Sequence, residues 1–410
     1  MTPIQAAAGP LRIAYVTETW PPEVNGVAMS AARLVDALLL RGHSIQLLRP
    51  SQGAGDLPTP QDRLETVLCR GAALPLYPSL RLGWAAPARL QALWRAWRPQ
   101  AVHVATEGPL GWAALLAARR LGLPVTSDFR TNFHAYSRHY GLGPLRPLLL
   151  AGLRSFHNRC RATTVPTEAL CRELAGQGFE RLQVIGRGVD TGLYHPARRS
   201  HALRSTWGVG PDDLVLAYVG RLAAEKNLDL LLQVAEAVQR VKPGSRLLLV
   251  GDGPRRAELQ QRFPQALFAG HRSGVDLAAH YASADLFLFP SLTETFGNVV
   301  TEAMASGLPV LAFDCAAAGQ LIASGRDGQL VPPGQDSEFL RQALLLALQG
   351  QQRRSLGERA SARVAELGWP GIARRFERML EALPVGPGQA PQVQVAESPQ
   401  PRAAALPSQP

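Results

Sequence analysis

Two acidic residues, Glu294 and Glu302, stand at the start of what reads as a helix after a buried strand. Apolar residues over 286–290 predict the strand, and the backbone amides of 296–298 would lie at the start of the helix. A carboxylate can accept two hydrogen bonds from neighbouring hydroxyls of a ribose or a hexose. The spacing therefore predicts one acid for each sugar of a nucleotide-sugar. Acids that only stabilise the helix N-terminus are the alternative.

A second motif, GRLAAEKN over 220–227, also follows a buried strand and precedes a helix. Ligands of open parallel sheets bind at the carboxyl ends of the strands, where a helix N-terminus offers free amides to a phosphate. Arg221 and Lys226 could converge there on a diphosphate. Lys226 is one of only two lysines in a chain that otherwise uses arginine, the other being Lys242. A surface loop with two solvated charges is the alternative.

Three more strand ends in the N-terminal half carry polar residues. The first, TETWPPEVNGV over 17–27, lacks GxGxxG, which argues against a dinucleotide-dependent dehydrogenase. Gly26 would still let a helix N-terminus approach a phosphate closely. Glu107 in ATEGPLG, and Arg130 and His134 in SDFRTNFH, would face the same cleft from the N-terminal side. Ordinary loops, and a structural histidine, are the alternatives.

Strands and helices alternate along the chain, which predicts parallel βαβ units and an α/β fold. The pattern restarts after a turn-rich stretch over 188–210, so we expect two Rossmann-like domains over 11–195 and 205–367. A helix over 368–384 could pack on either domain, and 385–410 is rich in Pro, Gln and Ala and predicts disorder. We expect strands over 12–17, 45–48, 101–105, 124–127, 162–165, 214–219, 246–250, 286–290, 310–313 and 329–331, and helices over 26–40 and 228–241.

The amino-acid composition and the net charge indicate which kinds of ligand the protein could bind. The chain has 410 residues, 46% hydrophobic and 18% charged, which suits a soluble protein with a large core. A formal net charge of +11 would attract phosphorylated ligands or anionic lipid. No zinc-finger spacing or basic-aromatic strip supports nucleic acid as a partner. The four cysteines lack CxxC spacing, which favours a reducing compartment: Cys69, Cys160, Cys171 and Cys315.

The sequence shows no targeting signal, and we therefore expect a cytoplasmic protein. No basic start followed by an apolar run indicates a signal peptide, and no apolar run approaches the roughly 20 residues of a membrane span. The stretch over 138–161 mixes arginines with leucines, so it could lie on an anionic inner membrane and bring a lipid acceptor to the cleft. A buried helix with solvated ends explains the same pattern.

Together these motifs resemble retaining glycosyltransferases of family 4 ("glycosyl transferases group 1"), which have the GT-B fold. GRLAAEKN, VGDGP over 250–254 and the E-x7-E element from Glu294 to Glu302 carry the resemblance, which covers about 12–380. TETWPPEVNGV, ATEGPLG and RGVDTGLYHP over 187–196 are similar to the mannosyltransferase and sulfoquinovosyltransferase-like branch. The resemblance implies that the last helix crosses back to the N-terminal domain.

The resemblance also implies roles for single residues. Arg221 and Lys226 would bind the donor diphosphate, Glu294 the transferred sugar and Glu302 the ribose, with Arg221, Lys226 and Glu294 as the catalytic set. The implied donor-binding positions are Gly26, Gly220, Arg221, Lys226, Gly251, Gly253, Glu294, Phe296, Gly297, Asn298 and Glu302. Glu107, Arg130 and His134 would lie on the acceptor side. Arg130 occupies the place of a family histidine that touches the donor sugar, and His134 follows four residues later.

The implied reaction transfers a hexose from a nucleotide diphosphate sugar, with GDP-mannose favoured and UDP-sugars (glucosyl or sulfoquinovosyl type) as the alternative. The acceptor would be a lipid or a glycan. No DxD-like pair follows a predicted strand, so we expect no metal and no other cofactor. A nucleotide-sugar epimerase would convert donor without an acceptor, and a non-catalytic binding subunit would bind donor without turnover.

Overall fold

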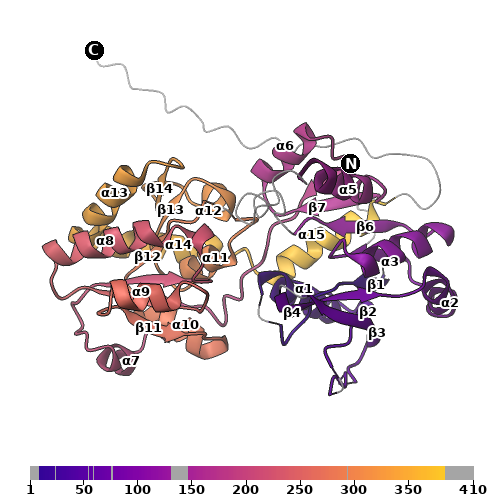
Figure 1. The fold of residues 1–410 in the computed structure, drawn as a ribbon, viewed down its shortest axis with the longest axis horizontal. Coiled ribbons are helices and arrows are strands. Elements are labelled where there is room, and N and C mark those ends of the chain that lie inside the picture. Colours follow the sequence, from indigo (N-terminus) through magenta and orange to yellow (C-terminus); the bar gives the residue numbers. More distant parts are fainter. Residues whose placement is uncertain are drawn as a thin grey trace, which may run out of the picture.

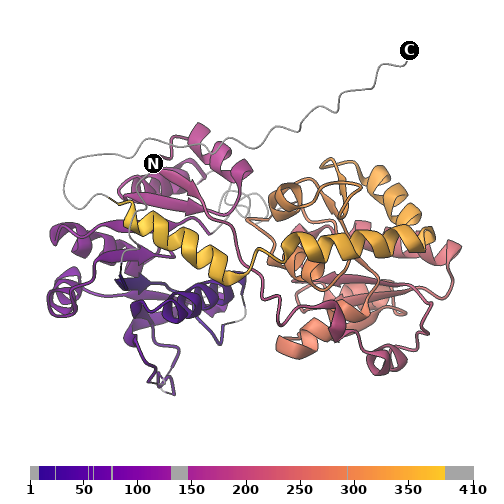
Figure 2. The same cartoon turned by 180° about the vertical axis from the view of Figure 1, so that it is seen from behind.

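The computed structural model describes residues 9–383 except 24, 54, 59, 75–76, 131–145 and 293. Figures 1 and 2 show two domains side by side, each with a sheet between layers of helices. Among the described residues, no helix is long and apolar enough to cross a membrane.

The N-terminal domain is built on an eight-stranded sheet of order β4-β3-β2-β1-β5-β6-β7-β8. All neighbours pair in parallel except β3 and β4, which are antiparallel. The strands are β1 (Arg12–Val16), β2 (Ser44–Pro50), β3 (Leu64–Leu74), β4 (Tyr77–Trp84), β5 (Ala101–Val104), β6 (Val125–Asp128), β7 (Ala162–Val165) and β8 (Leu182–Val184). The helices are α1 (Gly26–Leu40), α2 (Pro87–Trp97), α3 (Pro109–Arg120), α5 (Arg146–His157) and α6 (Glu168–Gly176).

The C-terminal domain has a six-stranded parallel sheet of order β11-β10-β9-β12-β13-β14. Its strands are β9 (Val215–Val219), β10 (Arg246–Val250), β11 (Leu267–Gly270), β12 (Leu286–Phe289), β13 (Val310–Phe313) and β14 (Gln329–Val331). Its helices are α8 (Leu228–Val241), α9 (Arg256–Arg262), α10 (Gly274–Ser283), α11 (Asn298–Ala305), α12 (Ala316–Leu321), α13 (Asp336–Leu348) and α14 (Gly350–Val364). Both sheets are doubly wound, as the alternation of strands and helices predicted.

The last helix, α15 (Trp369–Glu381), lies on the N-terminal domain, whereas α14 before it lies on the C-terminal domain (Figure 2). Its apolar face, with Phe376 at the centre, shares one buried cluster with residues of α1 and β1. Glu377 adds an ion pair with Arg41 and a contact of 3.1 Å with His43. The chain therefore crosses between the domains twice and closes on the domain where it began.

Residues 190–206 lie in the turn-rich stretch over 188–210, where we expected the first domain to end, and they fold onto the C-terminal domain. It contains the short helices η2 (Pro196–Arg198) and α7 (His201–Thr206). Arg199 and Arg204 both pair with Asp285, at 2.8 and 3.0 Å. These two helices were not predicted because turn-forming residues precede them and because they are too short to show the helical spacing of apolar residues.

Four strands of the structure were not predicted from the sequence: β3, β4, β8 and β11. β8 and β11 have three and four residues and are only partly buried, so they lack the apolar run that marks a buried strand. β3 carries Arg70 and Gly71 in its centre, which weaken a strand pattern. Gly71 is required there because a Cβ would meet the ring of Pro50 at 2.6 Å.

Candidate functional site

The strand order of the C-terminal sheet reverses between β9 and β12. These two strands are neighbours in the sheet, although β10 and β11 lie between them in the sequence. Crevices at such switch points, at the carboxyl ends of the strands, are the usual ligand sites of doubly wound sheets. The loop after β9 carries Arg221 and Lys226, and the loop after β12 carries Glu294. The fold thus brings the two predicted motifs to one point.

Lys226 and Glu294 are in direct contact there. The Lys226 Nζ lies 2.5 Å from Glu294 Oε1, and the two side chains are only 14% and 15% exposed. Lys226 ends a short turn, η3 (Ala224–Lys226), just before α8 begins. A partly buried ion pair at a strand edge holds both charges in place before a ligand arrives.

Arg221 differs from Lys226 because it is exposed. Its carbonyl accepts a hydrogen bond of 3.1 Å from the Tyr218 hydroxyl, which fixes the backbone of the loop. Its guanidinium makes no hydrogen bond or ion pair with any other residue that the structure describes. Arg221 is therefore available to an anionic ligand at the mouth of the crevice.

The predicted glycines of this edge have a clear backbone role. Gly220, Gly251 and Gly253 all have φ angles of 132° or more, on the positive side. A Cβ on Gly251 would collide with the carbonyl of Gly220, and one on Gly253 with the carbonyl of Leu222. The loops after β9 and β10 are joined by the hydrogen bond from Gly220 N to Val250 O, at 3.0 Å. These glycines let two loops lie against each other, so their types are explained without a ligand.

The start of α11 offers free amides beside Glu294. Gly297 caps the helix with φ 92°, and no side chain of the described residues caps its N-terminus. Phe296 is buried at 5% exposure and its carbonyl accepts a hydrogen bond from Ala317 N, so the loop before the helix is fixed. Uncapped amides at a fixed helix N-terminus are suited to an anion.

Glu302 lies further along α11 and is partly exposed. Tyr281 Oη donates a hydrogen bond of 2.9 Å to Glu302 Oε2. The Tyr194 hydroxyl acts on the same carboxylate and, like that of Tyr281, lowers its pKa. Burial raises the pKa of Glu302 to about 7, although the two hydroxyls act in the opposite direction. Neither tyrosine was singled out from the sequence, although Tyr194 lies within RGVDTGLYHP, one of the motifs that carry the family resemblance.

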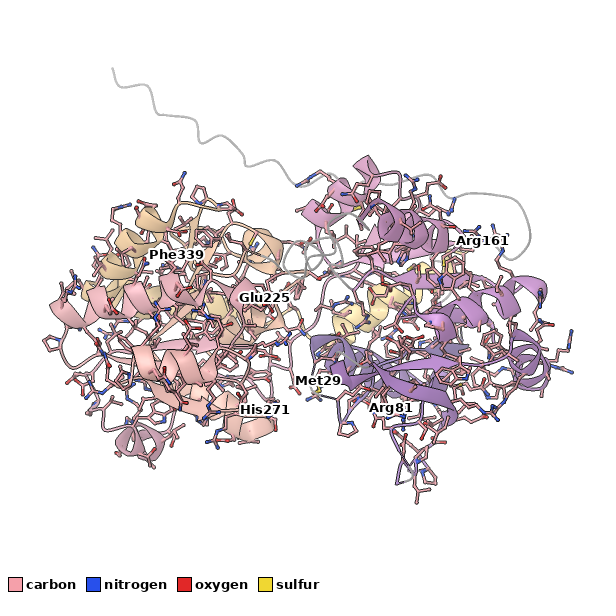
Figure 3. All side chains as sticks on the ribbon, viewed as in Figure 1. Met29, Arg81, Arg161, Glu225, His271 and Phe339 are labelled. Atoms are coloured by element: carbon pink, nitrogen blue, oxygen red, sulfur yellow. The ribbon has the colours of Figure 1, made fainter. Side chains whose placement is uncertain are left out.

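The N-terminal domain faces this edge with the start of α1. Asn25 caps α1 by accepting a hydrogen bond of 2.8 Å from Ala28 N. A Cβ placed on Gly26, the first residue of α1, would lie 3.5 Å from Asn298 Nδ2. Two helix N-termini from different domains thus approach each other. Figure 3 shows Met29 of α1 and Glu225 of η3 on the facing sides of the two domains.

Arg130 is buried inside the N-terminal domain and does not line the cleft. It is 4% exposed, and its guanidinium contacts Asp128 at 2.5 Å, Ser30 Oγ at 2.5 Å and the carbonyl of Val27 at 3.2 Å. Arg187 binds both oxygens of Asp128 from the other side. Burial alone would raise the pKa of Asp128, but the two arginines hold it below its usual range. This geometry supports the first turn of α1 from below, so the expected direct contact with an acceptor is not supported.

Glu107 lies at the switch point of the N-terminal sheet, after β5, and its Oε2 is buried without a hydrogen-bond partner among the described residues. Burial raises the pKa of Glu107 to about 7. Glu18, after the neighbouring β1, accepts a hydrogen bond of 2.8 Å from Leu110 N at the start of α3. A Cβ on Gly108 would collide with the Glu18 carboxylate, so the two motifs form one packed unit.

His134, which was predicted on the acceptor side, lies outside the described residues.

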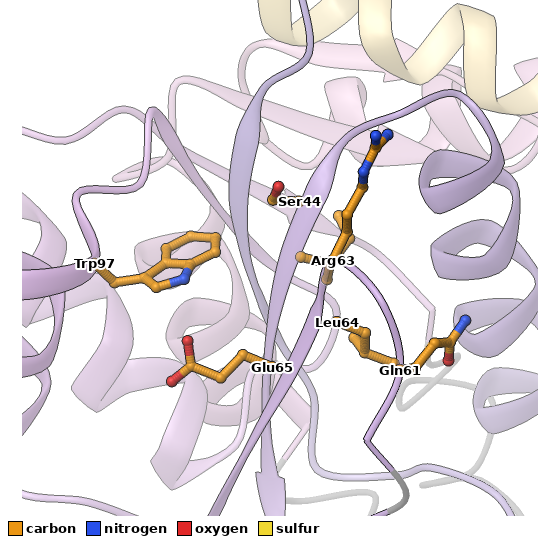
Figure 4. Close-up of a pocket in the computed structure, with 7 residues that line it drawn as sticks. Ser44, Gln61, Arg63, Leu64, Glu65 and Trp97 are labelled. Carbon is orange, nitrogen blue, oxygen red and sulfur yellow. The ribbon is translucent and has the colours of Figure 1, made fainter.

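A hollow of about 240 Å³ lies elsewhere on the N-terminal domain, and Ser44, Arg63 and Trp97 are among the residues that line it (Figure 4). The hollow lies where β2 and β3 begin, whereas Glu107 follows the carboxyl end of β5. The hollow is therefore at the other ends of the strands and is not the candidate site.

Known proteins are similar to this chain over most of its length. The family "Glycosyltransferase Family 4" matches residues 24–193, and "Glycosyl transferases group 1" matches residues 213–349. A GDP-mannose-dependent alpha-mannosyltransferase of Mycobacterium tuberculosis is 36% identical over 382 residues, which cover 91% of this chain and 97% of the relative. The chain is a glycosyltransferase of family 4. The enzyme is also 27% identical over 375 residues to sulfoquinovosyl transferase SQD2 of Arabidopsis thaliana, over 89% of this chain and 72% of that protein.

The fold of the enzyme is GT-B. A solved structure of Anabaena HepE in complex with UDP superposes with a TM-score of 0.73 at 20% identity, over 91% of this chain and all of that chain. The expected fold class, family and hexosyltransferase activity are therefore confirmed. The roles of the single site residues remain predictions.

Proposed function

We propose that the enzyme transfers mannose from GDP-mannose, with retention of configuration, to a hydroxyl of a lipid or glycan acceptor. The Mycobacterium tuberculosis relative is a GDP-mannose-dependent alpha-mannosyltransferase, and its 36% identity over 91% of this chain supports this donor. The observation that carries the proposal is the Lys226–Glu294 pair at the sheet switch point, beside the uncapped start of α11.

The proposed donor pose follows from the charges at this edge. Arg221 and Lys226 bind the diphosphate together with the amides of 296–298 and the start of α1 at Gly26. Glu294 binds the mannosyl hydroxyls and Glu302 the ribose. As the glycosidic bond breaks, negative charge grows on the leaving GDP, and fixed cations and helix amides stabilise it most at that moment. We expect turnover in EDTA, because no DxD-like pair follows a predicted strand.

On the acceptor side, Glu107 is the better candidate of the predicted residues. Its Oε2, which has no hydrogen-bond partner in the described part of the chain, lies at the switch point of the N-terminal sheet, where it could accept a hydrogen bond from an acceptor hydroxyl. A Glu107→Gln variant should raise the KM for acceptor and leave donor binding unchanged.

We further propose that α5 lies on an anionic membrane at the cytoplasmic face, which would bring a lipid acceptor to the cleft. Leu148 and Leu149 are 72% and 41% exposed, and Arg154 on the same helix is also exposed. Exposed leucines beside arginines suit the boundary between headgroups and acyl chains. Co-sedimentation with vesicles that contain phosphatidylglycerol should fall with rising salt and with Leu148→Gln, and salt-independent or absent binding contradicts the idea.

A UDP-sugar is the alternative donor, because SQD2 and HepE are also similar to the enzyme. A thermal-shift panel of GDP-mannose, UDP-glucose and UDP-sulfoquinovose separates the two bases. The donor that stabilises the fold is then incubated with glycolipid and glycan acceptors. Transfer to an acceptor supports the proposal, epimerisation of donor alone indicates an epimerase, and binding without any turnover indicates a non-catalytic subunit.

A further inference from the structure

Glu302 is held by a residue of the segment that connects the two domains. Tyr281 belongs to α10 of the C-terminal domain, but Tyr194 precedes η2 in the connecting segment. The Tyr194 ring is 9% exposed and packs edge-to-face on Tyr281, with ring centroids 5.8 Å apart. We propose that Tyr194 positions the Glu302 carboxylate for the nucleoside of the donor, so that the connecting segment takes part in donor binding. This inference rests on the proposed role of Glu302.

The chemistry of the contact favours this role. A carboxylate has about four acceptor positions, and Tyr281 occupies one of them at 2.9 Å. The Tyr194 hydroxyl also favours the ionised form of this carboxylate. Burial raises the pKa of both tyrosines, so each hydroxyl stays protonated and acts as a donor to Glu302. The remaining acceptor positions of this partly exposed carboxylate suit the two hydroxyls of a ribose.

Fold stability alone gives no reason for this arrangement. Glu302 has no ion pair with any described residue, and burial acts against its ionised form. A desolvated acid without a cation is an unfavourable choice for packing at the end of a cleft. Groups in this condition are common where a ligand completes the site.

The connecting segment is in turn attached to the N-terminal domain. Tyr194 N donates a hydrogen bond of 2.8 Å to the carbonyl of Asp190, so the backbone turns tightly between them. The Asp190 carboxylate accepts a hydrogen bond of 3.0 Å from Leu193 N. It also forms an ion pair with Arg33 of α1, with 3.4 Å between the nitrogen and the oxygen. Next to this turn, Val189 forms a bridge with Gly368 in the second crossing of the chain. Tyr194 itself packs in the core of the C-terminal domain, and it lies four residues after Asp190, whose carboxylate contacts α1 of the N-terminal domain.

The test is a double-mutant cycle of Tyr194→Phe and Glu302→Gln with nucleotide binding and kinetics as readouts. Phenylalanine keeps the ring that packs on Tyr281 and removes only the hydroxyl. A hydrogen bond to a charged group contributes about 1.5 kcal/mol or more, so the Kd for GDP and the KM for donor should rise about tenfold. kcat should change less than twofold. In the Glu302→Gln background the same substitution should change the Kd less than twofold.

The pH dependence gives an independent readout. Loss of the Tyr194 hydroxyl removes one hydrogen bond from the ionised carboxylate, so the acid limb of GDP binding should move to higher pH in Tyr194→Phe. An unchanged Kd and pH profile overturn the inference, and so does an equal loss in the Glu302→Gln background, which would indicate packing. If wild-type protein binds neither GDP nor UDP, the proposed function itself fails. Melting curves without nucleotide check that each variant is folded.

Discussion

The ammonium group of Lys226 lies 2.5 Å from a carboxylate oxygen of Glu294, although 68 residues separate them in the sequence. The pair joins the loops after β9 and β12 at the point where the strand order reverses. In the proposed donor complex, Lys226 would share its charge between this carboxylate and the diphosphate. The pair thus places a cation and a sugar-binding acid in fixed relation before the donor binds.

Replacement of Lys226 by alanine should lower kcat/KM for donor by about 100-fold or more, because one fixed cation no longer stabilises the leaving diphosphate. Steady-state transfer assays measure this change. Lys242→Ala is the matched control, since the only other lysine lies after α8, at the end of the sheet where β10 begins. Equal activities of the two variants would rule out the assignment.

Arg221→Ala should also lower the rate of turnover by a factor of about 100 or more, without loss of stability. Its guanidinium is exposed, so its removal breaks no contact that the described residues show. Transfer rates and Tm are compared with those of Arg240→Ala, an exposed arginine in the last turn of α8. Near-wild-type turnover of Arg221→Ala would remove the phosphate assignment.

Gly251→Ala should destabilise the C-terminal domain by roughly 2 kcal/mol or more, because the new Cβ collides with the carbonyl of Gly220 in a backbone at φ 132°. Urea unfolding followed by circular dichroism gives the value. Gly176→Ala is the control, because a Cβ at the end of α6 meets nothing within 4 Å. Wild-type stability of Gly251→Ala would show that the two loops can separate at low cost.

The stability of the enzyme should depend on pH through Glu302. Its pKa rises from the usual 4.5 to about 7 on folding, so the folded state keeps a proton that the unfolded chain releases. This contribution is present below about pH 4.5 and is lost as the pH rises through about 7. Glu302→Gln cannot lose a proton, so between pH 5 and pH 8 it should gain on the order of 2 kcal/mol relative to wild type.

Urea unfolding at the two pH values measures this difference. Glu366→Gln, at an exposed position, serves as the control and should show no comparable change. A difference between wild type and Glu302→Gln that stays constant with pH would contradict the ionisation of Glu302 in this range.

Local patterns in the sequence were enough for the overall architecture. Alternating apolar runs and helical spacing predicted both parallel sheets, because a strand buried on both faces has a continuous apolar run. The rule that parallel sheets bind ligands at their carboxyl ends then placed Arg221, Lys226, Glu294 and Glu302 on one edge. The same reasoning missed β8 and β11, which are short and only partly buried.

The fold class and the residues of one sheet edge could therefore be predicted from the sequence alone. The partners of the polar side chains could not be predicted: Lys226 pairs with Glu294, Arg130 pairs with Asp128 beneath α1, and the Tyr194 hydroxyl acts on Glu302. Periodicity and motif spacing report on local backbone geometry. The partners of a charged or hydroxyl side chain depend on strand order and on the path of the connecting segment, and these are fixed by the packing of residues far apart in the chain.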